Sequence, residues 1–258
     1  MGLCSLRQPM PFTVLKYALW VAGPCLQAVM AGFMLKRRLY RKYPVFFAYT
    51  VSHVIRFVVL FSLYHHGSKE AYRETYLVAD VLDAALAFAA IYEVFSNVFR
   101  AYEGIRKLAG IVFRWVLIVL VFVAVLTAAG STGSDNRRVL AGLFAFDQGV
   151  NIVRGGLLLL LLLFCSYLRL SWDHFVFGIA VGFALESSVE LVAFATLAHL
   201  GPVGSRALSL ILAAAYNCAV LVWLYYLLSP APAERPAKLP SHTELEDWNQ
   251  ALLELIYQ

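Results

Sequence analysis

Long apolar stretches separated by short polar connections recur along the whole chain. A membrane-spanning helix needs about 20 mostly apolar residues. The stretches that meet this length cover approximately residues 12–35, 44–64, 74–99, 108–130, 138–167, 175–200 and 206–228. The pattern therefore predicts an all-α membrane protein in which residues 1–228 form a seven-transmembrane-helix bundle.

The stretch from Gly142 to Tyr167 shows most clearly why these helices are expected to form a bundle. Asp147, Asn151 and Arg154 follow one another at helical spacing and share one face. Leucines occupy every position of 157–163 directly afterwards. Such a helix fits a membrane bundle, where its polar stripe contacts other helices and its leucines contact lipid.

The chain after the last apolar stretch divides into two parts. Residues 229–240 are rich in proline and predict a stiff linker. Within residues 241–258, Ser241 and Glu244 form a capping box that starts a short amphipathic cytoplasmic helix. Its apolar positions are the expected docking residues Leu245, Trp248, Leu252 and Ile256. The acidic polar side disfavours anionic lipid, so the helix packs on its own bundle or docks a protein partner or second copy.

Composition supports membrane insertion, and charge sets the expected orientation. The chain is 61% hydrophobic and 14% charged, against about 45–50% and about 25% for soluble domains. Leaving out the intramembrane Lys16, Arg56, Arg114 and Arg154, eleven Lys and Arg residues fall on one side of the predicted bundle and six on the other. Because the more basic side stays in the cytoplasm, we expect a plasma (inner) membrane protein with its N-terminus outside and its C-terminus cytoplasmic.

Ionisable residues inside the apolar stretches are the candidate functional residues, since each costs at least ~2.5–3.5 kcal/mol on insertion scales. The candidate ligand-binding or buried polar cluster comprises His53, Arg56, Asp80, Asp83, Asp147, Asn151, Arg154, Glu186, Glu190 and Asn217. Carboxylates outnumber cationic groups in this set, which predicts a polar cavity that opens outward. The cluster is interpreted either as an internal lattice that fixes helix register or as a site for a ligand, ion or proton. Nearer the cytoplasm, Glu93 and Arg114 are expected to form an ion pair.

Several known chemistries do not fit the residues present. A retinal protein needs a lysine in the last span, and residues 206–228 contain none. A membrane haem needs two histidines at matched depth, but His53 stands alone near the midplane. The sequence has no HExxH, GxSxG, Walker or GxGxxG motif, and its four cysteines show no CxxC spacing. We therefore expect no catalytic residues, no metal and no cofactor, and hence a non-enzymatic protein.

Three functions remain open at this stage. The first is a receptor-like sensing or partner-coupling module, with a polar cavity on one side and a docking helix on the other. The second is a small transporter or ion pathway, which the absence of a second broken helix disfavours. The third is a structural subunit of a larger membrane complex, for which the GxxxG spacing of Gly178 and Gly182 would provide an assembly surface.

Overall fold

The structure is a computed structural model that describes residues 10–100, 102–130, 142, 146, 149–159, 161, 173–197, 202–230, 246–247, 250 and 253–254. All regular elements in these ranges are helical. They are α1 (Met10–Lys36), the short 3-10 helix η1 (Leu39–Arg41), α2 (Pro44–His66), α3 (Lys69–Val98), α4 (Glu103–Gly130), α6 (His174–Leu197) and α7 (Pro202–Leu228). A further helical stretch, the Gly149–Leu159 helix, lies between α4 and α6.

Five of these helices are long and apolar enough to cross a membrane: Tyr17–Lys36, Pro44–His65, Glu103–Thr127, His174–Ala193 and Leu208–Leu228. The chain is therefore an all-α membrane protein, as the sequence predicted. The other two expected spans do not meet the same test. α3 carries many charged residues, and the described Gly149–Leu159 helix is short. A bundle with seven spans stays a prediction.

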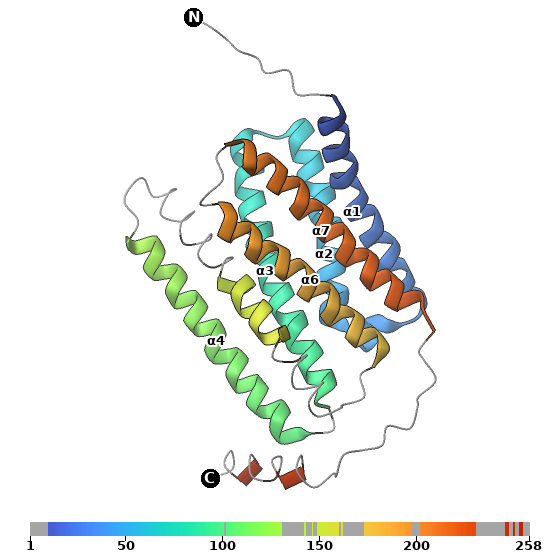
Figure 1. Cartoon of the computed structure of the whole chain (residues 1–258), viewed down its shortest axis with the longest axis vertical. Coiled ribbons are helices and arrows are strands. Elements are labelled where there is room, and N and C mark those ends of the chain that lie inside the picture. Colours follow the sequence, from blue (N-terminus) through green and yellow to red (C-terminus); the bar gives the residue numbers. More distant parts are fainter. Residues whose placement is uncertain are drawn as a thin grey trace, which may run out of the picture.

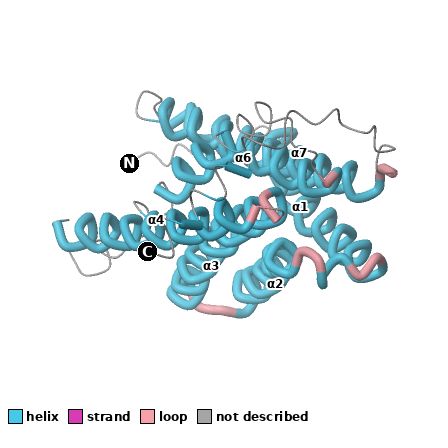
Figure 2. The backbone as a smooth tube through the Cα atoms, turned by 90° about the horizontal axis from the view of Figure 1, so that it is seen from below, coloured by secondary structure: helices cyan, strands magenta, loops and turns pink. Residues whose placement is uncertain are grey.

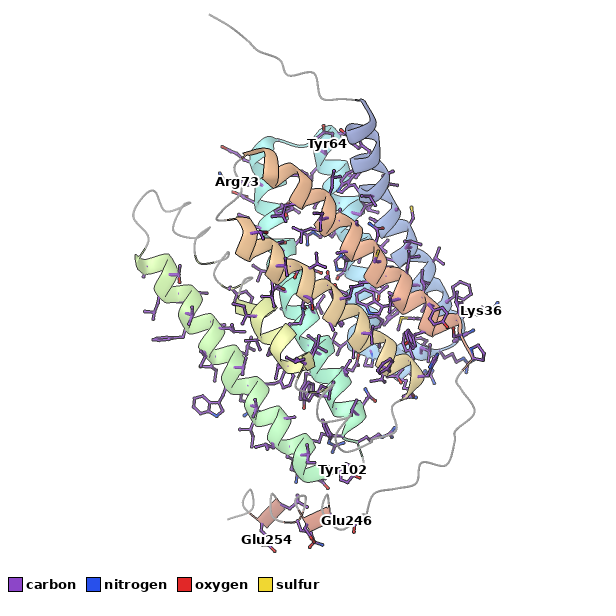
Figure 3. All side chains as sticks on the ribbon, viewed as in Figure 1. Lys36, Tyr64, Arg73, Tyr102, Glu246 and Glu254 are labelled. Carbon is purple, nitrogen blue, oxygen red and sulfur yellow. The ribbon has the colours of Figure 1, made fainter. Side chains whose placement is uncertain are left out.

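The helices lie roughly antiparallel in sequence order, with α4 at the margin (Figure 1). α6 packs along α7, α2 packs along α3, and α1 contacts both α2 and α7. Viewed end-on in Figure 2, α2 and α3 lie on one side and α6 and α7 on the other. Lys36 and Tyr102 lie at one end of the bundle, whereas Tyr64 and Arg73 lie at the opposite end (Figure 3).

Several helix boundaries differ from those expected, because capping residues outside the apolar stretches extend the helices. α3 begins at Lys69 rather than near Glu74, since the Ser68 hydroxyl accepts a hydrogen bond from Ala71 N at 3.1 Å. α7 begins with Pro202 instead of near Arg206, and proline suits the first helical turn because it needs no backbone donor there. The charged and polar residues that precede the apolar stretches therefore form the first turns of α3 and α7.

The two glycines of the predicted GxxxG spacing join α6 to α7 within the chain. A Cβ atom at Gly178 would overlap Tyr226, and one at Gly182 would overlap Trp223. Trp223 is completely buried and donates its indole N–H to the Ile179 carbonyl at 3.1 Å. The spacing does permit close helix approach. The expectation that it serves another chain is wrong, because α7 already covers both glycines.

Candidate functional site

The first half of the site is an ion-pair group between α2 and α3. His53 and Arg56 lie one turn apart on α2, opposite two carboxylates on α3. His53 Nε2 lies 2.7 Å from Asp83 Oδ1. Arg56 donates to Asp80 Oδ1 at 3.0 Å, and its other terminal nitrogen is 3.7 Å from Asp83 Oδ2. Asp83 is therefore shared by an imidazole and a guanidinium.

The second half centres on Arg154 of the Gly149–Leu159 helix, whose partners all come from α6. Its Nε donates to the Ser187 hydroxyl at 2.6 Å, and Nη2 donates to Glu190 at 2.5 Å. Nη1 lies 3.7 Å from Glu186 Oε2. The Arg154 side chain is only 5% exposed, so its charge depends on these partners rather than on water.

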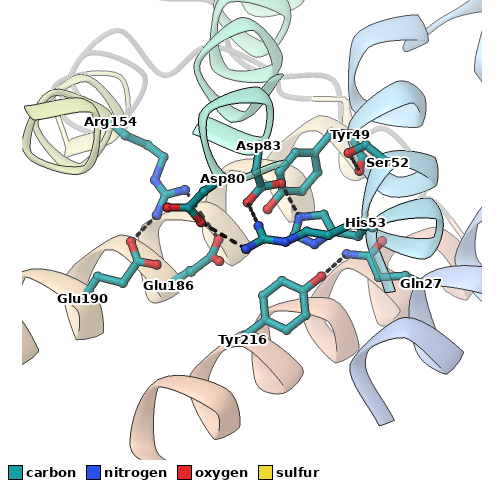
Figure 4. Close-up of polar contacts among 11 residues, drawn as sticks. Gln27, Tyr49, Ser52, His53, Asp80, Asp83, Arg154, Glu186, Glu190 and Tyr216 are labelled. Atoms are coloured by element: carbon teal, nitrogen blue, oxygen red, sulfur yellow. Dashed lines mark hydrogen bonds and ion pairs between the residues drawn. The ribbon is translucent and has the colours of Figure 1, made fainter. Parts of the chain in front are cut away.

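The two halves form one network, shown in Figure 4. Asp83 interacts electrostatically with Arg154 as well as with His53 and Arg56. Glu186 likewise interacts with both Asp83 and His53. Residues from α2, α3, the Gly149–Leu159 helix and α6 thus meet in one charged cluster, which we define as His53, Arg56, Asp80, Asp83, Arg154, Glu186 and Glu190.

The charged cluster contains more carboxylates than cationic groups. Four carboxylates face two guanidinium groups and one imidazole. With a neutral imidazole and ionised carboxylates the cluster carries a formal charge of about −2, and a charged imidazole leaves about −1. Oε2 of Glu186 is buried without a hydrogen-bond partner. Additional positive charge, from a proton or a bound cation, would lower the energy of this arrangement.

The carboxylates of the charged cluster differ in exposure. The side chains of Asp80, Asp83 and Glu190 are 41%, 25% and 24% exposed, whereas Glu186 is buried. The sequence predicted a polar cavity that opens outward. The described residues support partial access to the cluster at these three carboxylates, on its α3 and α6 sides.

A layer of aromatic rings closes the cluster toward the end of the bundle that carries Lys36. Phe46, Phe183 and Trp223 pack edge to face, with centroids 5.3 Å apart for Phe46–Trp223 and 5.0 Å for Phe183–Trp223. Tyr49 continues this layer, 5.2 Å from Phe183, and lies against the His53 ring at 4.6 Å. These four rings are fully or almost fully buried. The aromatic layer therefore bounds the cluster with apolar side chains on this side.

Two neutral polar residues near the cluster were not identified as site residues from the sequence. Gln27 of α1 donates to the Tyr216 hydroxyl of α7 at 2.8 Å, and Tyr216 interacts electrostatically with Glu186 and Asp83. Glutamine and tyrosine occur often in membrane helices without a site role, so neither signal was specific. Their hydrogen bond extends the polar region across α1 and α7.

The predicted candidates Asn217 and Asn151 occupy different positions. Asn217 donates to the carbonyl of Leu19 at 3.1 Å and to that of Ala213 at 2.7 Å, and it therefore fastens α7 to α1. Asn151 is buried on the same helix as Arg154. The candidate Asp147 lies outside the described residues, as do the docking residues Leu245, Trp248, Leu252 and Ile256.

Glu93 does not have the expected partner. Its carboxylate accepts hydrogen bonds from Val45 N at 3.0 Å and from Phe46 N at 2.9 Å, and thus caps the first turn of α2. Among the described residues, no ion pair joins Glu93 to Arg114, which is exposed on α4. The predicted pair is wrong because free backbone donors at a helix start satisfy a carboxylate as well as a guanidinium does.

A separate polar contact, missed from the sequence, holds the start of α6 to the turn before α2. Asp173 accepts from Phe175 N at 3.1 Å, from Lys42 Nζ at 2.5 Å and from the Tyr43 hydroxyl at 3.1 Å. Burial alone would raise the pKa of Asp173, but these donors hold it below its ordinary value. Burial and the neighbouring Asp173 carboxylate raise the pKa of Tyr43, which stays a donor. An aspartate just before an apolar stretch is an N-cap signal.

No group of three or more His, Cys, Asp or Glu side chains in the described ranges is arranged to hold a metal ion. No family model matches the chain, and no characterised protein or solved structure is significantly similar to it. The charged cluster is therefore the feature of the chain that points to a function.

Proposed function

We propose that the chain is a non-enzymatic, receptor-like sensing module in which the charged cluster is the binding site for a positively charged group. The observation that supports this proposal is the surplus of carboxylates over cationic groups inside the bundle. Both guanidinium groups already have carboxylate partners, so an anionic ligand would have to displace them. An ammonium group or a proton would instead complete the charge balance.

The geometry around the cluster favours sensing over transport. A ligand would enter beside Asp80, Asp83 and Glu190, whose carboxylates are partly exposed. The buried rings of Phe46, Phe183 and Trp223 close the other side, where an ion pathway would need polar groups or water. Because the cluster joins four helical elements, a bound cation would change how these helices hold together.

The proposed module crosses the membrane seven times, with its N-terminus outside and its C-terminus cytoplasmic. α3 would span despite its charges, because Asp80 and Asp83 are paired with Arg56 and His53 of α2. The change caused by ligand binding would pass to a protein partner that docks on residues 241–258, because the given sequence contains no motif typical of an output domain. Deleting residues 241–258 should then leave the bundle folded and remove this partner.

The cation proposal is tested by thermal unfolding of the full chain in nanodiscs, with methylammonium chloride as the probe and sodium chloride at the same ionic strength as the reference. We expect methylammonium to raise the Tm of the wild type. This shift should disappear in Asp80→Asn and Glu190→Gln and remain in Glu103→Gln, an exposed carboxylate outside the cluster. Equal Tm values in both salts for the wild type would contradict the proposal.

Flux measurements separate sensing from transport. Wild-type protein in liposomes with an entrapped pH-sensitive dye should pass neither protons nor methylammonium faster than empty liposomes. Flux that Glu190→Gln abolishes would instead assign the cluster to a transporter.

A further inference from the structure

α4 has a different environment from the other described helices. It packs on α3, chiefly through Phe113, whose ring lies 5.1 Å from Phe88 and 5.3 Å from both Tyr92 and Phe95. Its buried Leu120 lies beside Gly149 of the Gly149–Leu159 helix. The rest of α4 is largely open, and apolar side chains such as Trp115 and Phe122 are about 60% exposed. In a membrane, lipid covers these surfaces.

A groove of about 660 Å³ runs between α3 and α4. Its apolar lining includes Phe88, Phe113 and Leu117. Arg106 and Lys107 line it near the start of α4, and Arg114, next to Phe113 in the sequence, lines it about two turns farther along. The groove is therefore amphipathic along its length, with positive charge at the bundle end that carries Tyr102 (Figure 3).

The basic part of the groove retains positive charge after its internal contacts are considered. Glu103 lies 3.2 Å from Lys107 and offsets that charge. No ion pair among the described residues involves Arg106 or Arg114. Side chains of a helix lean toward its N-terminus, so Arg114 is directed toward the turn that carries Arg106. A long arginine side chain can thus reach the interfacial region while its stem stays apolar.

We propose that this groove binds an anionic phospholipid, with its phosphate between Arg106 and Arg114 and an acyl chain against Phe88, Phe113 and Leu117. The basic end fits a phosphate, which accepts charge-assisted hydrogen bonds from guanidinium groups. The apolar end fits hydrocarbon. Basic pockets between membrane helices on the cytoplasmic side are typical sites for anionic lipid headgroups. This site is separate from the charged cluster and does not depend on the function proposed for it.

The test uses native mass spectrometry on the full chain, freed of lipid in detergent and then given equal amounts of phosphatidylglycerol and phosphatidylcholine with the same acyl chains. The wild type should retain phosphatidylglycerol with a preference of about thirtyfold, the order expected for two arginines near the membrane surface at about 1 kcal/mol each. Arg106→Gln/Arg114→Gln should bring the preference to near unity. Arg38→Gln/Arg41→Gln, which removes two charges from the connection between α1 and α2 at the same end of the bundle, should keep it.

A second variant tests the groove without changing its charge. A Cβ at position 110 would lie 3.4 Å from the Tyr92 hydroxyl, an ordinary contact. Gly110→Leu therefore keeps the helix while its side chain fills the groove, and it should lose retained lipid. Helix content from circular dichroism confirms that each variant is folded.

Three results would overturn the proposal. The first is equal retention of both lipids by the wild type. The second is a phosphatidylglycerol preference that survives in folded Arg106→Gln/Arg114→Gln or Gly110→Leu. The third is anionic lipid that binds only after residues 241–258 are deleted, which would show that the acidic tail occupies the groove instead.

Discussion

Replacing Arg154 by glutamine should destabilise the bundle more than any other single change in the charged cluster. The guanidinium contacts Ser187, Glu186 and Glu190 and is almost completely buried. Its loss leaves two carboxylates close together in an apolar environment. Removing one partner of a buried ion pair typically costs about 3–5 kcal/mol, and we expect a loss of at least about 3 kcal/mol in the free energy of unfolding.

The assay is denaturant unfolding of the purified chain in mixed micelles, compared with Arg73→Gln as an exposed control on α3. The control should change stability by less than about 0.5 kcal/mol. Adding Glu190→Gln to Arg154→Gln should recover part of the loss, because one stranded carboxylate becomes neutral. The resulting coupling energy between the two positions should be about 1–3 kcal/mol.

Two results would refute this reasoning. The first is a cost of Arg154→Gln no larger than that of Arg73→Gln, which would mean that water or another charge satisfies Glu186 and Glu190. The second is additivity of the losses from Arg154→Gln and Glu190→Gln, which would mean that the two side chains do not stabilise each other.

Three further predictions concern residues outside the charged cluster. Glu93→Ala should lower the free energy of unfolding by about 2–4 kcal/mol in denaturant titrations, because two buried N–H groups at the start of α2 lose their acceptor. Lowering the pH below about 3.8 should destabilise the wild type by up to about 1 kcal/mol relative to Asp173→Asn. The pKa of the folded Asp173 carboxyl is depressed, so its stabilising effect is present above the unfolded value of 3.8 and is lost as the pH falls through the folded pKa. Gly182→Ala should cost about 1–3 kcal/mol in the same titrations, because its Cβ overlaps Trp223, whereas Gly156→Ala meets open space and should be neutral or slightly stabilising.

The membership of the charged cluster was largely predictable from the sequence, and its pairing only in part. Ionisable groups in a membrane interior must neutralise one another, which is why Arg56, Asp83 and Arg154 were expected together and are found in one network. The depth of an ionisable group along its helix does not determine which partner it contacts. The partner predicted for Glu93 was therefore wrong, because the sequence does not show that the start of α2 lies beside it.

The helices were predictable from apolar length, but their interfaces were not. The spacing of Gly178 and Gly182 indicates that some helix approaches closely, and it does not identify that helix as α7. The aromatic layer has the same origin, because Phe46 of α2 and Trp223 of α7 lie far apart in the sequence and their rings meet only in the interior of the folded bundle. Such contacts depend on the tertiary arrangement rather than on any local pattern.

The central claim is that the charged cluster accepts a positively charged group, and native mass spectrometry of protein extracted gently from its own membrane tests it most directly. The account predicts extra mass from a small cationic molecule on the wild type. That mass should be absent from Glu190→Gln and Asp80→Asn and present on Glu103→Gln. A bare polypeptide mass for the wild type, in a sample whose Tm also fails to respond to methylammonium or to pH, would contradict the claim and leave the cluster as a structural lattice.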